Sequence, residues 1–122
     1  MKILLADDNP EVRSALRLLL EQEPILAKVM EVTDTQGLLA NLSESCPMVV
    51  LLDWELPGLH NSDVLMIIRS RCPGIKVIAL SSKFEARQEA LAARVDAFIS
   101  KTEPPEQLLS TLRSFIPHQK NE

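Results

Sequence analysis

Short apolar runs alternate with amphipathic stretches along the chain, and this alternation predicts five strands that are each followed by a helix. The predicted strands cover Lys2–Ala6, Leu26–Val32, Met48–Asp53, Ile75–Leu80 and Val95–Ser100. The predicted helices cover residues 10–21, a segment from 33 onward, 62–71, 82–93 and 105–115. The third strand is continuously apolar, as a strand buried on both faces should be.

Capping residues support these helix starts. Asn9 is a good N-cap for the first helix, and Pro10 suits its first position. Two later starts have the capping-box spacing, with a hydroxyl followed three residues later by Glu or Gln. These pairs are Thr33 with Gln36, and Ser82 with Glu85.

Repeated strand–helix units predict an α/β fold with a parallel sheet covered on both faces. By analogy with the flavodoxin-like group, we expect a (βα)5 three-layer sandwich with a five-stranded sheet of order 2-1-3-4-5. Residues 1–117 are predicted to form one domain, with 118–122 as a C-terminal tail or linker.

Composition narrows the class of protein. The 122 residues are 46% hydrophobic and carry a net charge of −4, which favours a folded globular domain. We expect no direct nucleic-acid binding because there is no basic stripe, and no membrane span because the apolar runs are too short. Without a visible signal peptide, a cytoplasmic location is predicted. Cys46 and Cys72 lack metal or redox-motif spacing, so they are expected to be buried or idle thiols in a reducing compartment.

Five chemical groups stand at the ends of four predicted strands. Three are carboxylates, one is a hydroxyl and one is an amine: Asp7, Asp8, Asp53, Ser81 and Lys101. Ligands of open α/β sheets lie beyond the carboxyl ends of the strands, so these groups should converge. Carboxylates gathered in one place need a cation, and Mg²⁺ (with Mn²⁺ as a substitute) prefers oxygen ligands and phosphate. Asp53 is also a candidate nucleophile, because aspartyl phosphates are an established covalent intermediate.

The same residues resemble the receiver domain of two-component response regulators, the CheY-like family, over roughly residues 2–115. The motifs are Ala6-Asp7-Asp8-Asn9, Asp53-Trp54-Glu55-Leu56-Pro57-Gly58, Leu80-Ser81-Ser82 and Phe98-Ile99-Ser100-Lys101. Some positions depart from the usual family pattern, although none removes a group needed for phosphorylation. They are Thr102 in place of proline, Arg94 and Asn61 in place of glycine, Ser81 in place of threonine and Phe98 in place of tyrosine.

The resemblance implies that Asp53 accepts phosphate from a phosphohistidine of a sensor histidine kinase or a histidine phosphotransfer protein. It implies that Asp7, Asp8, Asp53 and the backbone carbonyl of Glu55 hold Mg²⁺. Ser81 would then move toward the phosphoryl group, and Phe98 would change rotamer. The repacked surface, formed by residues 82–93, 95–100 and 105–115, would serve a homodimer or an effector.

Several interpretations stay open at this point. Phe98 is either a rotamer switch or fixed core, and Trp54 is either a partly exposed lid beside the site or a packing residue. Glu55 and Lys83 flank the site; they either pair across its mouth and slow hydrolysis of the phosphate, or are solvated, unpaired charges. Rival functions are a phosphohydrolase of the haloacid-dehalogenase type, a flavodoxin and a degenerate receiver used as a scaffold. The leading interpretation is a binding module that catalyses only its own phosphorylation and dephosphorylation.

Overall fold

The computed structural model describes residues 2–23 and 28–115, and within them five parallel strands form one sheet. The strand order is β2-β1-β3-β4-β5, as predicted. The strands are β1 (Lys2–Ala6), β2 (Lys28–Val32), β3 (Val49–Asp53), β4 (Lys76–Ser81) and β5 (Ala97–Ser100). The predicted start of the second strand at Leu26 and the predicted tail at 118–122 lie outside the described residues.

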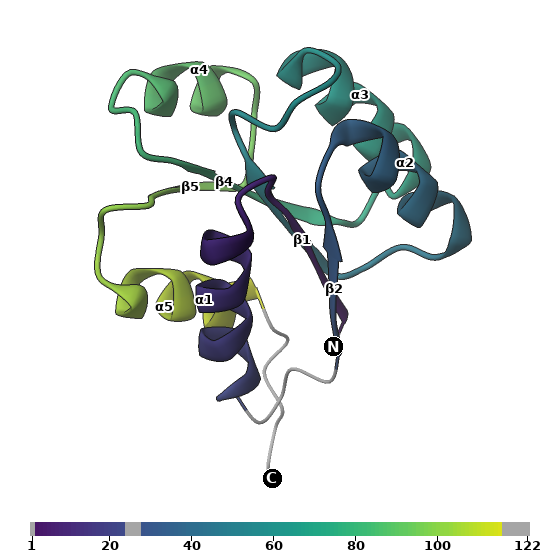
Figure 1. Ribbon diagram of the computed structural model, residues 1–122. Coiled ribbons are helices and arrows are strands. Elements are labelled where there is room, and N and C mark those ends of the chain that lie inside the picture. Colours follow the sequence, from purple (N-terminus) through teal and green to yellow (C-terminus); the bar gives the residue numbers. More distant parts are fainter. Residues whose placement is uncertain (1, 24–27, 116–122) are drawn as a thin grey trace, which may run out of the picture.

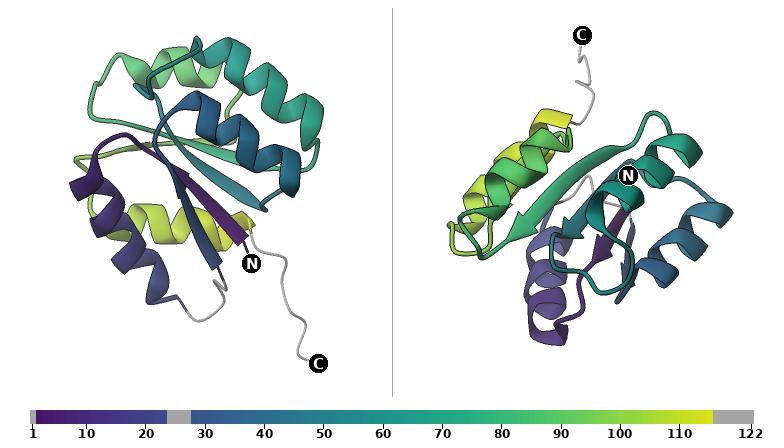
Figure 2. Two further views of the ribbon diagram at one scale, coloured as in Figure 1. Left: turned by 45° about the vertical axis from the view of Figure 1, so that its right-hand side comes forward. Right: turned by 90° about the horizontal axis from the view of Figure 1, so that it is seen from above.

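The helices cover both faces of this sheet and make it the middle of three layers. They are α1 (Pro10–Glu21), α2 (Thr35–Glu44), α3 (Asn61–Arg71), α4 (Ala86–Ala92) and α5 (Pro105–Phe115). Figures 1 and 2 show α2, α3 and α4 on one face, with α1 and α5 on the other. The flavodoxin-like three-layer sandwich predicted from the sequence is therefore confirmed.

Strand β3 explains why the sheet is buried on both sides. Successive side chains of a strand point to opposite faces, so each face receives alternate residues. Val50 and Leu52 belong to the apolar cluster under α2, α3 and α4. Val49 and Leu51 belong to the cluster under α1 and α5. All four are fully buried, which accounts for the uninterrupted apolar run in the sequence.

The strand register brings the carboxyl ends of four strands to one edge of the sheet. Ala6 of β1 pairs with Leu52 of β3, so Asp7 and Asp53 follow at the same level. On the other side, Ser81 of β4 pairs with Ser100 of β5, directly before Lys101. The sequence pattern and the parallel register together place the candidate site at this edge.

Two of the three predicted helix caps are wrong. Asn9 caps α1 as expected, and its side chain accepts hydrogen bonds from the amides of residues 11 and 12. Helix α2, however, is capped by Asp34, whose carboxylate accepts from the Gly37 amide at 2.8 Å, and not by a Thr33–Gln36 box. Helix α4 begins only at Ala86 without a side-chain cap, because residues 82–85 form a turn.

The cysteine prediction is also wrong, because Cys46 and Cys72 form a disulfide. Cys46 is exposed after α2, whereas Cys72 is buried at the end of α3. Helices α2 and α3 lie side by side (Figure 1), and their ends place the two Cα atoms 5.7 Å apart. A separation of 26 residues in the sequence gives no sign of this proximity.

One residue other than glycine has a positive φ angle in the described part of the chain. Arg94, just before β5, has a φ of 70°, in the left-handed region that favours glycine. Within residues 2–23 and 28–115, none of the helices combines the length and the apolar character that a membrane crossing needs.

Candidate functional site

Three aspartates meet at the carboxyl edge of the sheet. Asp7 follows β1 and Asp53 ends β3, and their exposed fractions are 0% and 2%, while Asp8 is exposed. One carboxylate oxygen from each lies within 4.8 Å of the others. Burying like charges so close together costs free energy unless a cation neutralises them. The structure thus confirms the predicted convergence of these acids.

Lys101 supplies part of this neutralisation. Its Nζ lies 2.9 Å from Oδ2 of Asp7 and 3.2 Å from Oδ1 of Asp53. Its backbone amide donates to the carbonyl of Ser81 at 2.9 Å, so the end of β5 is held against the end of β4. Burial by itself lowers the pKa of the Lys101 ammonium, but the two carboxylates outweigh it and raise that pKa above its ordinary value. Lys101 therefore stays charged in the site.

The Asp53 side chain is held in place by contacts, but its ionised form is disfavoured by its surroundings. Its Oδ1 accepts a hydrogen bond from the amide of Glu55 at 3.0 Å, in addition to the contact with Lys101. Burial raises the pKa of the Asp53 carboxyl, and the nearby Asp7 charge adds to that effect. The Glu55 amide and Lys101 oppose the rise without cancelling it. The ionised form, which is the nucleophilic one, would gain from a bound cation.

The oxygen atoms of the site suit a hard divalent cation. Oδ1 of Asp7 is fixed by the Asn9 amide at 2.9 Å. Oδ2 of Asp7 is buried and, among the described residues, accepts no hydrogen bond of ordinary geometry, although Lys101 lies near it as an ion pair. A buried oxygen with an unused lone pair, beside two further carboxylates, matches the oxygen ligands that Mg²⁺ takes. The residues present therefore fit the predicted metal.

Ser81 has an unexpected partner. Its buried Oγ donates to the carboxylate of Glu55, at 3.1 Å from Oε1 and 2.9 Å from Oε2. Of the two interpretations of Glu55 and Lys83, the ion pair is wrong, since the ion pairs among the described residues do not include these two side chains. Lys83 contributes its backbone amide instead, which donates to Ser81 Oγ at 3.0 Å. Glu55 therefore contacts the hydroxyl directly.

The two aromatic residues take different positions. Trp54 is only 4% exposed, so the packing interpretation holds and the lid interpretation is wrong. Its indole N–H donates to Oε1 of Glu89 on α4 at 2.7 Å. Phe98 is half-buried against the cluster under α2, α3 and α4, with the Arg87 guanidinium 6.0 Å from its ring centroid. Its packing leaves both predicted roles open.

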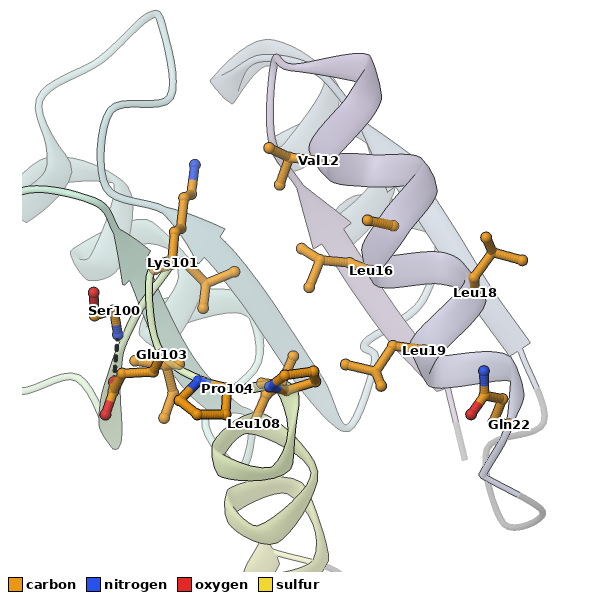
Figure 3. A pocket seen from close by; sticks show the side chains of 14 residues that line it. Val12, Leu16, Leu18, Leu19, Gln22, Ser100, Lys101, Glu103, Pro104 and Leu108 are labelled. Carbon is orange, nitrogen blue, oxygen red and sulfur yellow. Dashed lines mark hydrogen bonds between the residues drawn. The ribbon is translucent and has the colours of Figure 1, made fainter.

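A groove of about 560 Å³ adjoins the site between α1 and α5. Figure 3 shows Leu16 and Leu19 of α1 facing Pro104 and Leu108, with Lys101 at one end. Its walls are chiefly aliphatic, so they do not supply ligands for a cation or a phosphoryl group. The polar chemistry is confined to the aspartate cluster beyond Lys101.

Some supporting residues were not predicted from the sequence. Arg13 donates to the backbone carbonyl of Asp7 at 2.8 Å and so fixes the start of the acidic pair. Asn9, predicted only as a helix cap, also donates its amide to Asp7. Asn9 directly follows Asp7 and Asp8 in the sequence, and this adjacency could have predicted its contact with Asp7. Nothing in the local pattern pointed to Glu89 as the partner of Trp54.

Comparisons with known proteins agree with this geometry. The chain matches the family described as the response regulator receiver domain over residues 3–113. It is 30% identical over 118 residues to the transcriptional activator protein ExaE of Pseudomonas putida, covering 95% of this chain and 55% of that protein. It is 32% identical over 114 residues to the nitrate/nitrite response regulator protein NarL of Escherichia coli, covering 90% and 52%.

Among solved structures, the chemotaxis response regulator CheY4 of Vibrio cholerae shares the fold. The TM-score is 0.81 with 23% identity, over 94% of this chain and 98% of that one. Because the family match covers most of the chain, the protein belongs to the receiver domain family of two-component response regulators. Receiver domains are generally signalling modules rather than enzymes, and they typically bind Mg²⁺ at an acidic pocket. The chain spans about half the length of the curated relatives it matches.

Proposed function

We propose that this receiver takes a phosphoryl group onto Asp53 from a phosphohistidine of a sensor histidine kinase or a histidine phosphotransfer protein. The observation that carries the proposal is the position of Lys101 Nζ, 2.9 Å from Asp7 and 3.2 Å from Asp53 within the three-aspartate cluster. A lone carboxylate at a strand end would need no such arrangement. An ammonium beside a buried carboxylate is suited to the charge of a transferred phosphoryl group.

In the transfer, a carboxylate oxygen of Asp53 forms a bond to phosphorus while the bond from phosphorus to the histidine nitrogen breaks. The imidazole leaves with the electron pair of that bond. Lys101 stabilises the negative charge on the phosphoryl oxygens, and Ser81 donates a hydrogen bond to one of them afterwards.

Asp7, Asp8, Asp53 and the backbone carbonyl of Glu55 would hold Mg²⁺, or Mn²⁺ in its place. When bound, the metal offsets charge on the acids and on the phosphoryl oxygens. Asp7 is already oriented for this role by the Asn9 amide and by Arg13. Hydrolysis of the aspartyl phosphate then returns the domain to its resting state, so the chain acts only on itself.

The output surface is the face formed by α4, β5 and α5. Phe98 lies half-buried in it, packed against the core with the Arg87 guanidinium 6.0 Å from its ring centroid, and its ring would change rotamer when Ser81 moves. Phe84, 89% exposed in the turn before α4, lies with Arg87 and Phe98 around one hollow of this face. A homodimer or an effector protein would bind here, in the cytoplasm and without direct contact between this domain and nucleic acid. Residues 1–117 form the receiver unit, and 118–122 a tail or linker.

The test is phosphorylation by acetyl phosphate and, separately, by a phosphohistidine donor, followed by intact-mass measurement. With Mg²⁺, the wild type should gain one phosphoryl group, and EDTA should prevent it. Asp53→Asn should gain none, whereas Asp63→Asn, which changes an exposed acid in the first turn of α3, should react like the wild type. A wild type unmodified by both donors, or a modified Asp53→Asn, would overturn the proposal.

A further inference from the structure

The only O–H donor of Ser81 is occupied in this structure. Both oxygens of the Glu55 carboxylate lie within hydrogen-bond distance of Ser81 Oγ, at 3.1 Å and 2.9 Å. A hydroxyl has one proton to donate. The acceptor side of the same oxygen is used by the Lys83 amide at 3.0 Å. Ser81 therefore cannot donate to a phosphoryl group without leaving Glu55.

Glu55 also contacts the other reactive group. Its backbone amide donates to Oδ1 of Asp53 at 3.0 Å, while its side chain accepts from Ser81. One residue thus joins the phosphoacceptor at the end of β3 to the hydroxyl at the end of β4. In the described part of the chain, the Glu55 side chain is exposed and takes part in no other hydrogen bond or ion pair. Its role is therefore directed at Ser81 rather than at packing.

We propose that Glu55 is a positioning residue that holds Ser81 in its resting place and so sets how readily the domain switches. The inference rests on the proposed function, in which Ser81 moves to the phosphoryl group. A phosphoryl group on Asp53 is negatively charged and repels the nearby Glu55 carboxylate. The repulsion weakens the Glu55–Ser81 hydrogen bond at the moment when Ser81 gains a new acceptor. The strength of that bond opposes the switch, and phosphorylation must overcome it.

The test measures binding of beryllofluoride with Mg²⁺, a stable stand-in for the phosphoryl group, by ¹⁹F NMR titration. Four proteins form a double-mutant cycle: the wild type, Glu55→Ala, Ser81→Ala and the double variant. Loss of a hydrogen bond to a charged group corresponds to about tenfold in affinity, so Glu55→Ala should bind about tenfold more tightly than the wild type. In the Ser81→Ala background the same change should have about threefold effect or less, from charge repulsion alone.

A second measurement needs no ligand. The Lys83 amide donates to Ser81 Oγ, so its hydrogen exchange reports whether Ser81 is held. Exchange at Lys83 should be faster in Glu55→Ala than in the wild type. Glu55→Gln, which keeps a neutral acceptor of the same size, should lie between them.

The outcomes separate this inference from the proposed function. If the wild type binds beryllofluoride but Glu55→Ala tightens binding equally in both backgrounds, the positioning role is overturned and the phosphoacceptor role stands. Unchanged hydrogen exchange at Lys83 in Glu55→Ala would likewise overturn the positioning role alone. If neither the wild type nor Glu55→Ala binds beryllofluoride, the proposed function fails and the inference falls with it.

Discussion

The indole N–H of Trp54 donates a hydrogen bond to Glu89 of α4 at 2.7 Å, although the two residues are 35 positions apart. Trp54 directly follows the proposed phosphoacceptor Asp53. Its backbone carbonyl also accepts from Asn61 at the start of α3, at 2.7 Å. The segment after β3 is thus hydrogen-bonded both to α3, the helix that follows it, and to α4, which belongs to the proposed output surface. Movement at the site therefore has a direct physical route to that helix.

Loss of the hydrogen bond between Trp54 and Glu89 should lower the free energy of unfolding. Glu89→Ala leaves the buried indole N–H without a partner, so we expect the free energy of unfolding to fall by about 1–2 kcal/mol. Glu89→Gln retains an acceptor and should lose less than half as much. Urea denaturation followed by the fluorescence of Trp54, the sole tryptophan of the chain, measures the change. Glu85→Ala is the control, because Glu85 makes no side-chain cap bond; equal losses in both alanine variants would contradict the expectation.

Divalent metal should stabilise the folded protein. A ligand that binds only the folded state adds about 1.4 kcal/mol at a concentration ten times its dissociation constant. We expect Mg²⁺ to raise the melting temperature in a dose-dependent manner, and EDTA to reverse the effect. Asp8→Asn removes an exposed ligand and should abolish the increase, whereas Glu44→Gln at the end of α2 should preserve it. A comparable rise in Asp8→Asn would place the metal elsewhere.

The raised pKa of Asp53 predicts a pH dependence of stability in the absence of metal. Because burial raises the pKa of Asp53 above its ordinary value of 3.8, the folded state holds the proton to a higher pH than the unfolded state does. The contribution of Asp53 is therefore fully favourable at low pH and is lost as the pH rises through the folded-state pKa. Asp53→Asn cannot ionise, so the free energy of unfolding of this variant should exceed that of the wild type increasingly toward neutral pH. Urea denaturation in EDTA over a pH series tests this, and a pH-independent difference would refute it.

The disulfide predicts a redox dependence of stability without a loss of chemistry. Closing a loop with a sequence separation of 26 residues corresponds to about 3.5 kcal/mol in the chain-entropy model. Reduction should lower the free energy of unfolding by an amount of this order, and Cys46→Ser should show the lower value with or without reductant. Labelling of Asp53 by acetyl phosphate should persist, because the bridge lies at the opposite end of β3 from the site. Equal stability of the oxidised and reduced wild type would argue against the bridge.

Arg94 offers a stabilising substitution. A non-glycine residue in the left-handed region lowers the free energy of unfolding by about 1–2 kcal/mol. Replacement by glycine removes this strain, but glycine also gives the unfolded chain more conformational freedom, which offsets part of the gain. With φ at 70°, Arg94→Gly should raise the free energy of unfolding by about 0.5–1 kcal/mol. Urea denaturation measures the change, and Arg94→Ala, which keeps the Cβ atom, serves as the matched control. A gain in both variants would assign the effect to the arginine side chain.

The sequence was sufficient to predict which residues lie at the carboxyl ends of the strands. Continuous apolar runs located β3 and β4, and the parallel arrangement then required Asp53 and Lys101 to lie at one edge. That inference depends only on the alternation of side chains and on a shared strand direction. For the same reason Asp7, Asp8 and Ser81 were predicted to lie at this edge, where the structure places them.

Contacts between side chains that are distant in the sequence could not be predicted from the hydrophobic pattern. The bridge between Cys46 and Cys72 depends on how α2 packs beside α3, and the sequence spacing does not encode that distance. The partner of Glu55 was misassigned to Lys83 because a charged partner was assumed, whereas the donor that reaches its carboxylate is the hydroxyl of Ser81. The start of α2 was misplaced because Asp34 is a better cap at that backbone position than Thr33.

The positions of β1 and β5 at opposite ends of the sequence have a consequence for protein synthesis. Lys101 follows the last strand of the sheet, while Asp7 follows the first, and 94 positions separate these two ion-paired residues. A growing or cleaved polypeptide that ends before β5 would expose its clustered aspartates without their ammonium counterpart. Such a fragment would lack the ammonium that the proposed transfer to Asp53 uses, so we expect it not to accept a phosphoryl group.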